Sequence, residues 1–149
     1  MIFLDVAVLA LGAAFAGREL LESWLDLTLW TLAAAAVGVA AIQSPSGQLL
    51  GMDMPVLLAV GYLFGPLAGG IVAFAGYIDI REFRGEISFE RALFNRAQTS
   101  LSVVAAATVF SAVSSGVDIL PAAAFGALLA VAVDCLVNYG MVAGLMALK

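Results

Sequence analysis

The stretch from Met52 to Ile80, MDMPVLLAVGYLFGPLAGGIVAFAGYIDI, decides the fold of this chain. It is long and apolar, with no charged residue between Met54 and Ile78. Small residues recur in it every four positions, at Gly61, Gly65, Gly69 and Ala73. On one helix these residues share a face, and a face of small residues lets two helix backbones approach closely inside a bilayer. We therefore predict that this stretch forms the central helix of a membrane bundle, with its glycines in helix contacts.

Pro66 interrupts this stretch near its middle. A proline inside a helix removes one backbone N–H and clashes with the preceding turn, so we predict a kink or break near Gly65. Within a bilayer a broken helix is tolerated only against protein or a watery cavity. One interpretation is therefore a pocket beside the break, and the other is a glycine-rich seam that binds no ligand.

The composition places the whole chain in a membrane. Of its 149 residues, 64% are hydrophobic and only 11% are charged, whereas an average soluble domain is about half apolar and a quarter charged. We predict an all-α, multi-pass protein of the inner (plasma) membrane, formed as a single transmembrane domain over residues 1–149, with the lipid bilayer as its first partner. The formal net charge of −5 argues against nucleic acid as a partner.

The composition also restricts the chemistry. The chain has no histidine, which is the commonest general base and the commonest metal ligand. No phosphate-binding loop, nucleophile elbow or cluster of metal-ligating residues is evident. We expect no metal site and no catalysis by this chain, and the sequence gives no indication of a cofactor.

Hydropathy predicts about five spans, over residues 1–17, 24–43, 54–80, 99–115 and 119–148. The segment 81–98 contains four of the six basic residues, alternating with acidic and apolar ones, and is predicted to be an interfacial, amphipathic connector. A cytoplasmic connector puts all six basic residues on one side, with the N-terminus outside and the C-terminus inside. A sixth crossing would need residues 52–80 to form a hairpin, whose halves are short for full crossings.

Three residues mark helix boundaries around these spans. Asp53, followed by Pro55, is typical of a helix start. Gly85 is predicted to break the connector, and Ser88 is predicted to be the N-cap of the helix that leads into the fourth span.

Asp134 is the sharpest chemical signal. It lies near the midpoint of the last span, four residues before Asn138, so both side chains share a helix face. An intramembrane carboxylate is costly unless it is paired, solvated or protonated, and no span contains a basic residue to pair with it. We therefore expect a neutral carboxyl or a wet cavity. Two roles remain open: a site for a proton, a cation or a polar group of a ligand, or a hydrogen bond that joins two helices.

Further polar and aromatic residues are candidates for the same polar core. Asn95 and Gln98 are predicted to bridge helix ends where the fourth span meets the cytoplasm. Tyr139, beside Asn138, either lines a pocket or belongs to the core or interface, and the same alternatives hold for Tyr62, Tyr77 and Trp30.

Two more features of the last span concern its packing. Gly140 and Gly144 form a second small-residue pair, suited to helix contacts within this chain, in a homo-oligomer or with other membrane subunits. Cys135, the one cysteine, is expected to be a small buried apolar residue.

The chain resembles a family of bacterial membrane modules. The resemblance rests on the runs ALFNRAQTSLSVVAAATVF, residues 92–110, and CLVNYGMVAGLMAL, residues 135–148. These runs resemble multi-span N-terminal modules of signalling proteins that carry cytoplasmic HD-type phosphohydrolase or diguanylate cyclase domains. The matching residues are Phe94, Asn95, Gln98, Leu101, Ser102 and Asn138, and upstream Pro55, Phe64, Gly65, Pro66 and Gly69. The resemblance covers residues 54–148 and implies a sensory module coupled to a cytoplasmic signalling domain.

A second resemblance rests on the run LFGPLAGG, residues 63–70. It is similar to the substrate-binding subunits of energy-coupling-factor vitamin transporters, which have six spans and dock on a partner through small-residue faces. The run LAAAAVGVAAI, residues 32–42, would suit such docking. We expect a non-catalytic sensory or small-ligand-binding membrane module. The alternatives are a substrate-binding transporter subunit of this type, or a structural subunit of a larger membrane complex.

Overall fold

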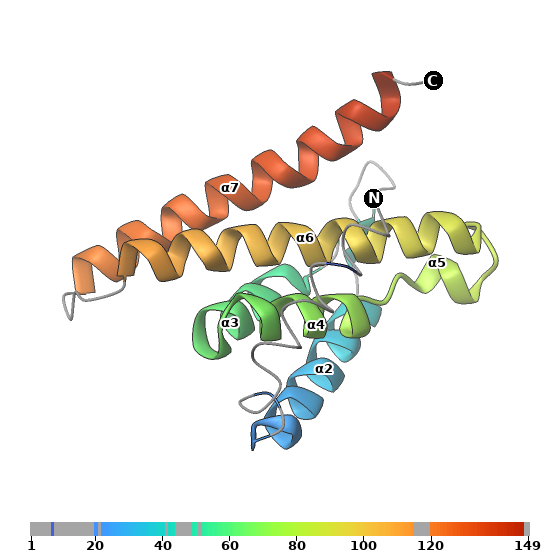
Figure 1. Cartoon of the computed structure of the whole chain (residues 1–149). Coiled ribbons are helices and arrows are strands. Elements are labelled where there is room, and N and C mark those ends of the chain that lie inside the picture. The colour runs from blue at the N-terminus through green and yellow to red at the C-terminus, as the bar shows by residue number, and fades with distance from the viewer. Residues whose placement is uncertain are drawn as a thin grey trace.

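Almost every residue that the structure describes is helical (Figure 1). The computed structural model describes residues 22–40, 42–43, 49–50, 52–114 and 120–147, together with Ala7 and Leu20. Its helices are α2 (Trp24–Val39), α3 (Met54–Phe64), α4 (Pro66–Gly76), α5 (Ile80–Phe83), α6 (Phe89–Ser114) and α7 (Leu120–Ala147). Two short strands, β1 (Ile42–Gln43) and β2 (Leu49–Leu50), pair antiparallel. The predicted all-α class is confirmed, while the predicted span over residues 1–17 lies, apart from Ala7, outside the described residues.

Helices α6 and α7 are the two described helices that are long and apolar enough to cross a membrane. They lie side by side and antiparallel (Figure 1). Helix α7 closely matches the predicted last span. Helix α6 begins ten residues before the predicted residue 99, because the connector from Phe89 onward continues the same helix. Small residues line their contact, since Ala106 and Ala130 are fully buried and Gly126 lies against the Phe110 ring.

Helices α3 and α4 form a hairpin rather than one helix. Gly65 separates them with φ 90° and ψ 167°, a conformation that favours glycine, and Pro66 begins α4. A Cβ atom on Gly69 would lie 2.6 Å from the Gly61 Cα, whereas residues eight apart in one straight helix are separated by about 12 Å. The chain therefore folds back at Gly65. The predicted break is confirmed, and the single helix over residues 54–80 is wrong.

The hairpin packs against α6 through its glycines. The Ser100 hydroxyl donates to the Gly70 carbonyl at 2.9 Å, and a Cβ on Gly69 would lie 3.0 Å from the Val103 side chain. Gly61, on the other arm, lies against Ala107 in the same way. The four largest fully buried apolar side chains come from these three helices: Leu57, Val60, Val72 and Val103. The core of the described fold thus lies where the hairpin meets α6.

Helix α2 crosses the hairpin at a steep angle (Figure 1). It ends at Val39, earlier than the predicted residue 43. Close to this end, a Cβ on Gly38 would lie 2.9 Å from the Ile78 carbonyl oxygen, so the end of α2 lies beside the start of the connector. Five alternating crossings put those two points on opposite sides of a membrane, and the structure does not confirm that alternation.

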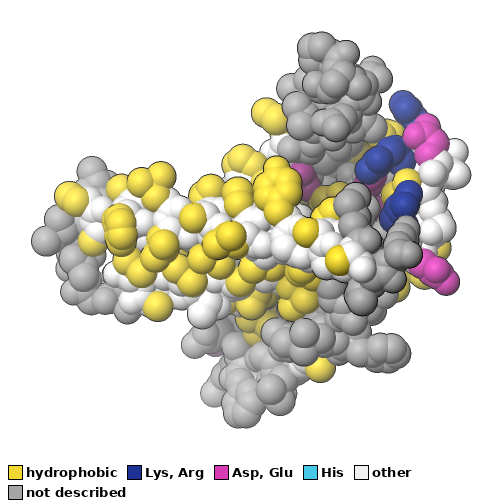
Figure 2. Space-filling model, turned by 90° about the horizontal axis from the view of Figure 1, so that it is seen from above, with side chains coloured by type: hydrophobic (Ala, Val, Ile, Leu, Met, Phe, Trp, Pro, Cys, Tyr) yellow, Lys and Arg dark blue, Asp and Glu magenta, His cyan; other side chains and the backbone are white. Residues whose placement is uncertain are grey.

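Two boundary residues of the connector behave as predicted. Gly85 turns the chain with φ 69°, and the Ser88 hydroxyl accepts a hydrogen bond from the Arg91 N–H at 3.4 Å, as an N-cap does. Asp53 also occupies the position before α3, with Pro55 in the first turn, although its side chain makes no capping hydrogen bond. On the face that Figure 2 shows, most of the charged side chains gather at one end of the molecule, while hydrophobic side chains cover the exposed face of α7.

Candidate functional site

Polar side chains join α6 to α7 in two successive pairs. The Ser102 hydroxyl donates to the Asp134 carboxylate and lies 3.1 Å from the Asp134 carbonyl oxygen. One turn away, the Gln98 amide donates to the side-chain oxygen of Asn138 and, at 3.0 Å, to its carbonyl oxygen. Residues four apart share a helix face, so an antiparallel pair of helices brings both pairs together. Asp134 and Asn138 do share one face, as their spacing predicts.

A cavity of about 410 Å³ lies between α3 and α7. Its lining is apolar apart from Tyr62 and Asp134, the other residues being Met54, Pro55, Leu58, Ala59 and Val131. Ligand pockets in proteins have this size and this character, namely apolar walls with a few polar groups that fix orientation. Asp134 thus takes part in the α6–α7 contact and also lines this cavity.

Tyr62 lines the cavity from α3. The Tyr62 ring is held by stacking on Phe110, with centroids 4.1 Å apart and planes inclined by 22°. Its hydroxyl oxygen is buried and has no hydrogen-bond partner among the described residues. An unsatisfied buried hydroxyl costs about 1–3 kcal/mol, so this oxygen weakens the packing of α3 rather than offering a contact to a ligand.

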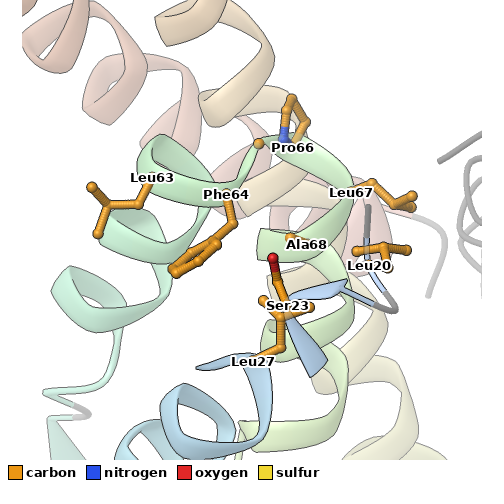
Figure 3. Close-up of a pocket in the computed structure, with 9 residues that line it drawn as sticks. Leu20, Ser23, Leu27, Leu63, Phe64, Pro66, Leu67 and Ala68 are labelled. Atoms are coloured by element: carbon orange, nitrogen blue, oxygen red, sulfur yellow. The ribbon is translucent and has the colours of Figure 1, made fainter. Parts of the chain in front are cut away.

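A second cavity, of about 370 Å³, lies beside the turn of the hairpin (Figure 3). Leu63–Ala68 line it from the hairpin, and Leu20, Ser23 and Leu27 line it from the N-terminal side. The first hydrogen bond of α4 runs from the Gly69 N–H to the Gly65 carbonyl. The N–H groups of Leu67 and Ala68 come before it in the chain and are therefore among those that have no acceptor within the helix. This cavity lies where the break at Pro66 predicted a pocket.

Ionisable groups gather where the two arms of the hairpin end. The Arg81 guanidinium contacts the Asp79 carboxylate at 2.6 Å, and this hydrogen bond lowers the pKa of Asp79 below its ordinary 3.8. Burial raises the pKa of Asp53 above the same ordinary value, and the Asp79 charge adds to that shift. Burial, with the Asp79 and Asp53 charges, also raises the pKa of Tyr77 to about 12. The Asp79 charge acts on both Asp53 and Tyr77, so the two ends of the hairpin lie close together.

A further ion pair ties the connector to the start of α6. The Arg96 guanidinium contacts the Glu82 carboxylate at 2.9 Å, and both side chains are mostly buried. The polar end of the hairpin is thereby fixed to the helix against which the hairpin packs.

The other predicted site residues lie outside both cavities. Asn95 is half-buried on α6 and makes no hydrogen bond to the described part of the chain, and Tyr139 is 77% exposed on α7. Gly140 and Gly144 are exposed, and a Cβ on either would meet nothing within 4 Å. The prediction that Cys135 is buried is wrong, because it lies on an exposed part of α7. Over the described ranges, no three metal-ligating side chains come together.

Sequence reasoning missed Ser102 as the partner of Asp134. The signal was present, because Ser102 follows Gln98 by four residues as Asn138 follows Asp134. Two polar pairs with equal spacing on neighbouring helices indicate two successive hydrogen-bonded contacts between those helices. The sequence left open a hydrogen bond from Asp134 to another helix but did not identify the partner, because the partner depends on the register between α6 and α7.

Comparisons with known proteins add no relative. No family model, no curated protein and no solved structure matches this chain.

Proposed function

We propose that the chain is a multi-pass inner-membrane protein in which α6 and α7 cross the bilayer. Their length and apolar character support this, as does the hydrophobic face that α7 leaves exposed. The basic residues of the connector favour a cytoplasmic position for the end of the molecule where charges gather.

The hairpin of α3 and α4 enters and leaves the bilayer on that same side in this proposal. Each arm has 11 residues and is therefore about 16 Å long, roughly half of a hydrocarbon core. The contact between Gly61 and Gly69 and the closeness of Asp53 to Asp79 support a fold-back over its whole length. A re-entrant hairpin reduces the predicted five crossings to four. The segments before residue 54 then lie on the opposite side of the membrane from the side predicted for each of them. The connector and the C-terminus remain cytoplasmic.

The function that the geometry supports best is binding of a small ligand within the membrane, as a sensory or ligand-binding module without catalysis. The observation that carries it is the α3–α7 cavity, in which Asp134 lies among apolar and aromatic walls. Because Asp134 also accepts the Ser102 hydrogen bond, a ligand at Asp134 would act directly on the α6–α7 contact. Movement of α7 would then pass the signal to a cytoplasmic or membrane partner.

The resemblance to bacterial sensor modules agrees with this coupling. Gln98, Ser102 and Asn138 carry that resemblance, and all three take part in the hydrogen bonds between α6 and α7. Coupling to a signalling domain is part of the proposal and rests on this resemblance.

The second candidate is a substrate-binding subunit of a membrane transporter. The cavity at the turn of the hairpin favours it, because a break in a membrane helix beside a cavity exposes backbone groups that can bind a substrate. The exposed Gly140 and Gly144 would serve contacts with other subunits in either case, or in a purely structural subunit.

The two cavities can be tested separately by filling each one. Ala59 lines the α3–α7 cavity and Leu27 lines the cavity at the turn. Nonylamine, nonanol and nonanoate serve as probes, and the shift in unfolding temperature is measured in lipid nanodiscs. We expect Ala59→Trp to abolish the shift given by any binding probe, while Leu27→Trp and the exposed control Ala143→Trp retain it. Loss of the shift with Leu27→Trp alone would favour the second candidate. Equal shifts in all four proteins, or no shift in any, would contradict a ligand site in the α3–α7 cavity.

A further inference from the structure

The cavity between α3 and α7 is lined by the carboxyl group of Asp134, beside which the described residues place no cation. Asp134 is only 7% exposed, and the Ser102 hydroxyl is the one donor to its side chain among the described residues. Within the described part of the chain, no arginine or lysine lines the cavity. The basic residues within the described ranges all belong to the connector segment 81–98. A ligand that occupies this cavity therefore meets an acidic group whose charge no described residue balances there.

We propose that this cavity takes a lipophilic amine, with its ammonium group on Asp134 and its apolar body among the side chains of α3. The inference rests on the proposed ligand-binding function and adds the chemical class of the ligand. An ammonium supplies the missing counter-charge, and a paired intramembrane carboxylate is far less costly than an unpaired one.

The head of the ligand is selected by Asp134. An ammonium has three N–H donors and no acceptor, so it can bind the Asp134 carboxylate through an N–H and balance its charge. An alcohol can donate a hydrogen bond to the carboxylate but leaves it without a counter-charge, and a carboxylate ligand would be repelled by it. The Tyr62 ring belongs to the wall of the cavity, while its buried hydroxyl lies out of reach of the ligand.

The walls of the cavity select the rest of the ligand. Met54, Pro55 and Leu58 offer only apolar surface, and Ala59 and Val131 continue it. A volume of about 410 Å³ holds a body of drug-like size. Val131 is itself exposed on α7, so the cavity borders the face that would contact lipid, and the ligand would reach it from the bilayer.

The test compares nonylamine, nonanol and nonanoate, which share one chain and differ in the head. Affinities are measured by calorimetric titration in nanodiscs of zwitterionic lipid, so that the membrane does not itself concentrate the amine. For the wild-type protein we expect nonylamine to bind about tenfold or more tightly than nonanol, which corresponds to the charge pair. We expect no measurable binding of nonanoate.

Asp134→Asn isolates the charge, because asparagine keeps the shape and can still accept the Ser102 hydrogen bond. We expect it to bind nonylamine and nonanol within about twofold of each other. Asp26→Asn, which removes an exposed carboxylate on α2, should keep the wild-type preference. Tyr62→Phe, which removes only a buried hydroxyl, should likewise keep that preference.

Two results would overturn the inference. If nonanol binds the wild-type protein as tightly as nonylamine, the cavity binds ligands but not amines in particular, and the proposed function survives without this inference. A preference for nonylamine that persists in Asp134→Asn would place the amine elsewhere. If no probe binds, both the proposed function and the inference fail. The preference for nonylamine over nonanol is measured on the wild-type protein, so it tests the inference even if Asp134→Asn does not fold.

Discussion

Gly61 and Gly69 lie in direct backbone contact on opposite arms of the hairpin, such that a Cβ atom on Gly69 would lie 2.6 Å from the Gly61 Cα. Contacts this close between helices require residues without side chains. On a single helix, glycines at this spacing would form a stripe on the outer surface. In this structure, Gly61 and Gly69 instead form the contact between two helices, which we call the seam. The cavity that contains Tyr62 depends on this seam, because it determines where α3 lies relative to α7.

Gly69→Ala should destabilise the fold by about 1–3 kcal/mol, since the added methyl group meets backbone on one side and the Val103 side chain on the other. Thermal unfolding in detergent measures the effect. Gly140→Ala and Gly144→Ala are the matched controls, because a Cβ there meets nothing within 4 Å, and they should be neutral or slightly stabilising. A Gly69→Ala protein as stable as these controls would show that the two arms do not touch.

Gly65→Ala tests the turn itself. No atom lies within 4 Å of a Cβ placed at Gly65, so any loss of stability must come from the backbone conformation at φ 90°. Such conformations cost a residue other than glycine about 1–3 kcal/mol. Unfolding should therefore occur at a lower temperature than in Gly144→Ala. Equal melting of the two variants would mean that the chain does not turn at Gly65 in this way.

Ser102→Ala should remove the one described donor to the Asp134 carboxylate, at a cost of about 1–3 kcal/mol. Combining it with Asp134→Leu should cost less than the sum of the two single changes, because the second change removes the group left unpaired. Thr108→Val is the control, since it removes a hydroxyl that bonds only to a carbonyl of its own helix at an exposed position. Additive effects of Ser102→Ala and Asp134→Leu would contradict the α6–α7 contact.

The Asp79–Arg81 ion pair should make stability fall in acid. The folded-state pKa of Asp79 lies below its ordinary 3.8, so the unfolded chain takes up protons first as the pH falls. The contribution of the pair is fully present above about pH 5 and is lost as the pH falls through the lowered folded-state pKa. Asp79→Asn should therefore flatten the acid side of the stability curve, while the exposed-site control Asp26→Asn should not. A curve that Asp79→Asn leaves unchanged would show that the pair does not stabilise the fold.

Much of the helical structure could be predicted from the sequence, but the path of the chain could not. Pro66 and Gly65 predict a break, because a proline lacks the N–H that the helix needs at that position. They do not determine the direction in which the next helix leaves, and that direction depends on what the arms contact. On one helix the glycines would share a face, whereas in the structure Gly61 and Gly69 pack against each other across the turn.

The candidate site shows the same limit. The four-residue spacing of Asp134 and Asn138 placed them on one face, because helix geometry alone determines that. Pairing with Ser102 depends on the register between α6 and α7, and the cavity beside Tyr62 depends on the fold-back of α3. Tyr139 and Cys135, assigned to the polar core and to the buried interior, lie on the exposed side of α7 instead.

The most direct test of the account is the side of the membrane from which the two ends of the hairpin can be labelled. Met52 precedes α3, Phe83 ends α5 after the hairpin, and both side chains are exposed. Met52→Cys and Phe83→Cys are made separately in a Cys135→Ser background and treated with a membrane-impermeant thiol reagent in oriented vesicles. A re-entrant hairpin predicts that both cysteines react from the same side, the cytoplasmic one, and that Leu63→Cys, near the turn, reacts from neither side. Reaction of Met52→Cys and Phe83→Cys from opposite sides would mean that residues 54–80 cross the membrane once, and would contradict the fold-back on which the proposed ligand site depends.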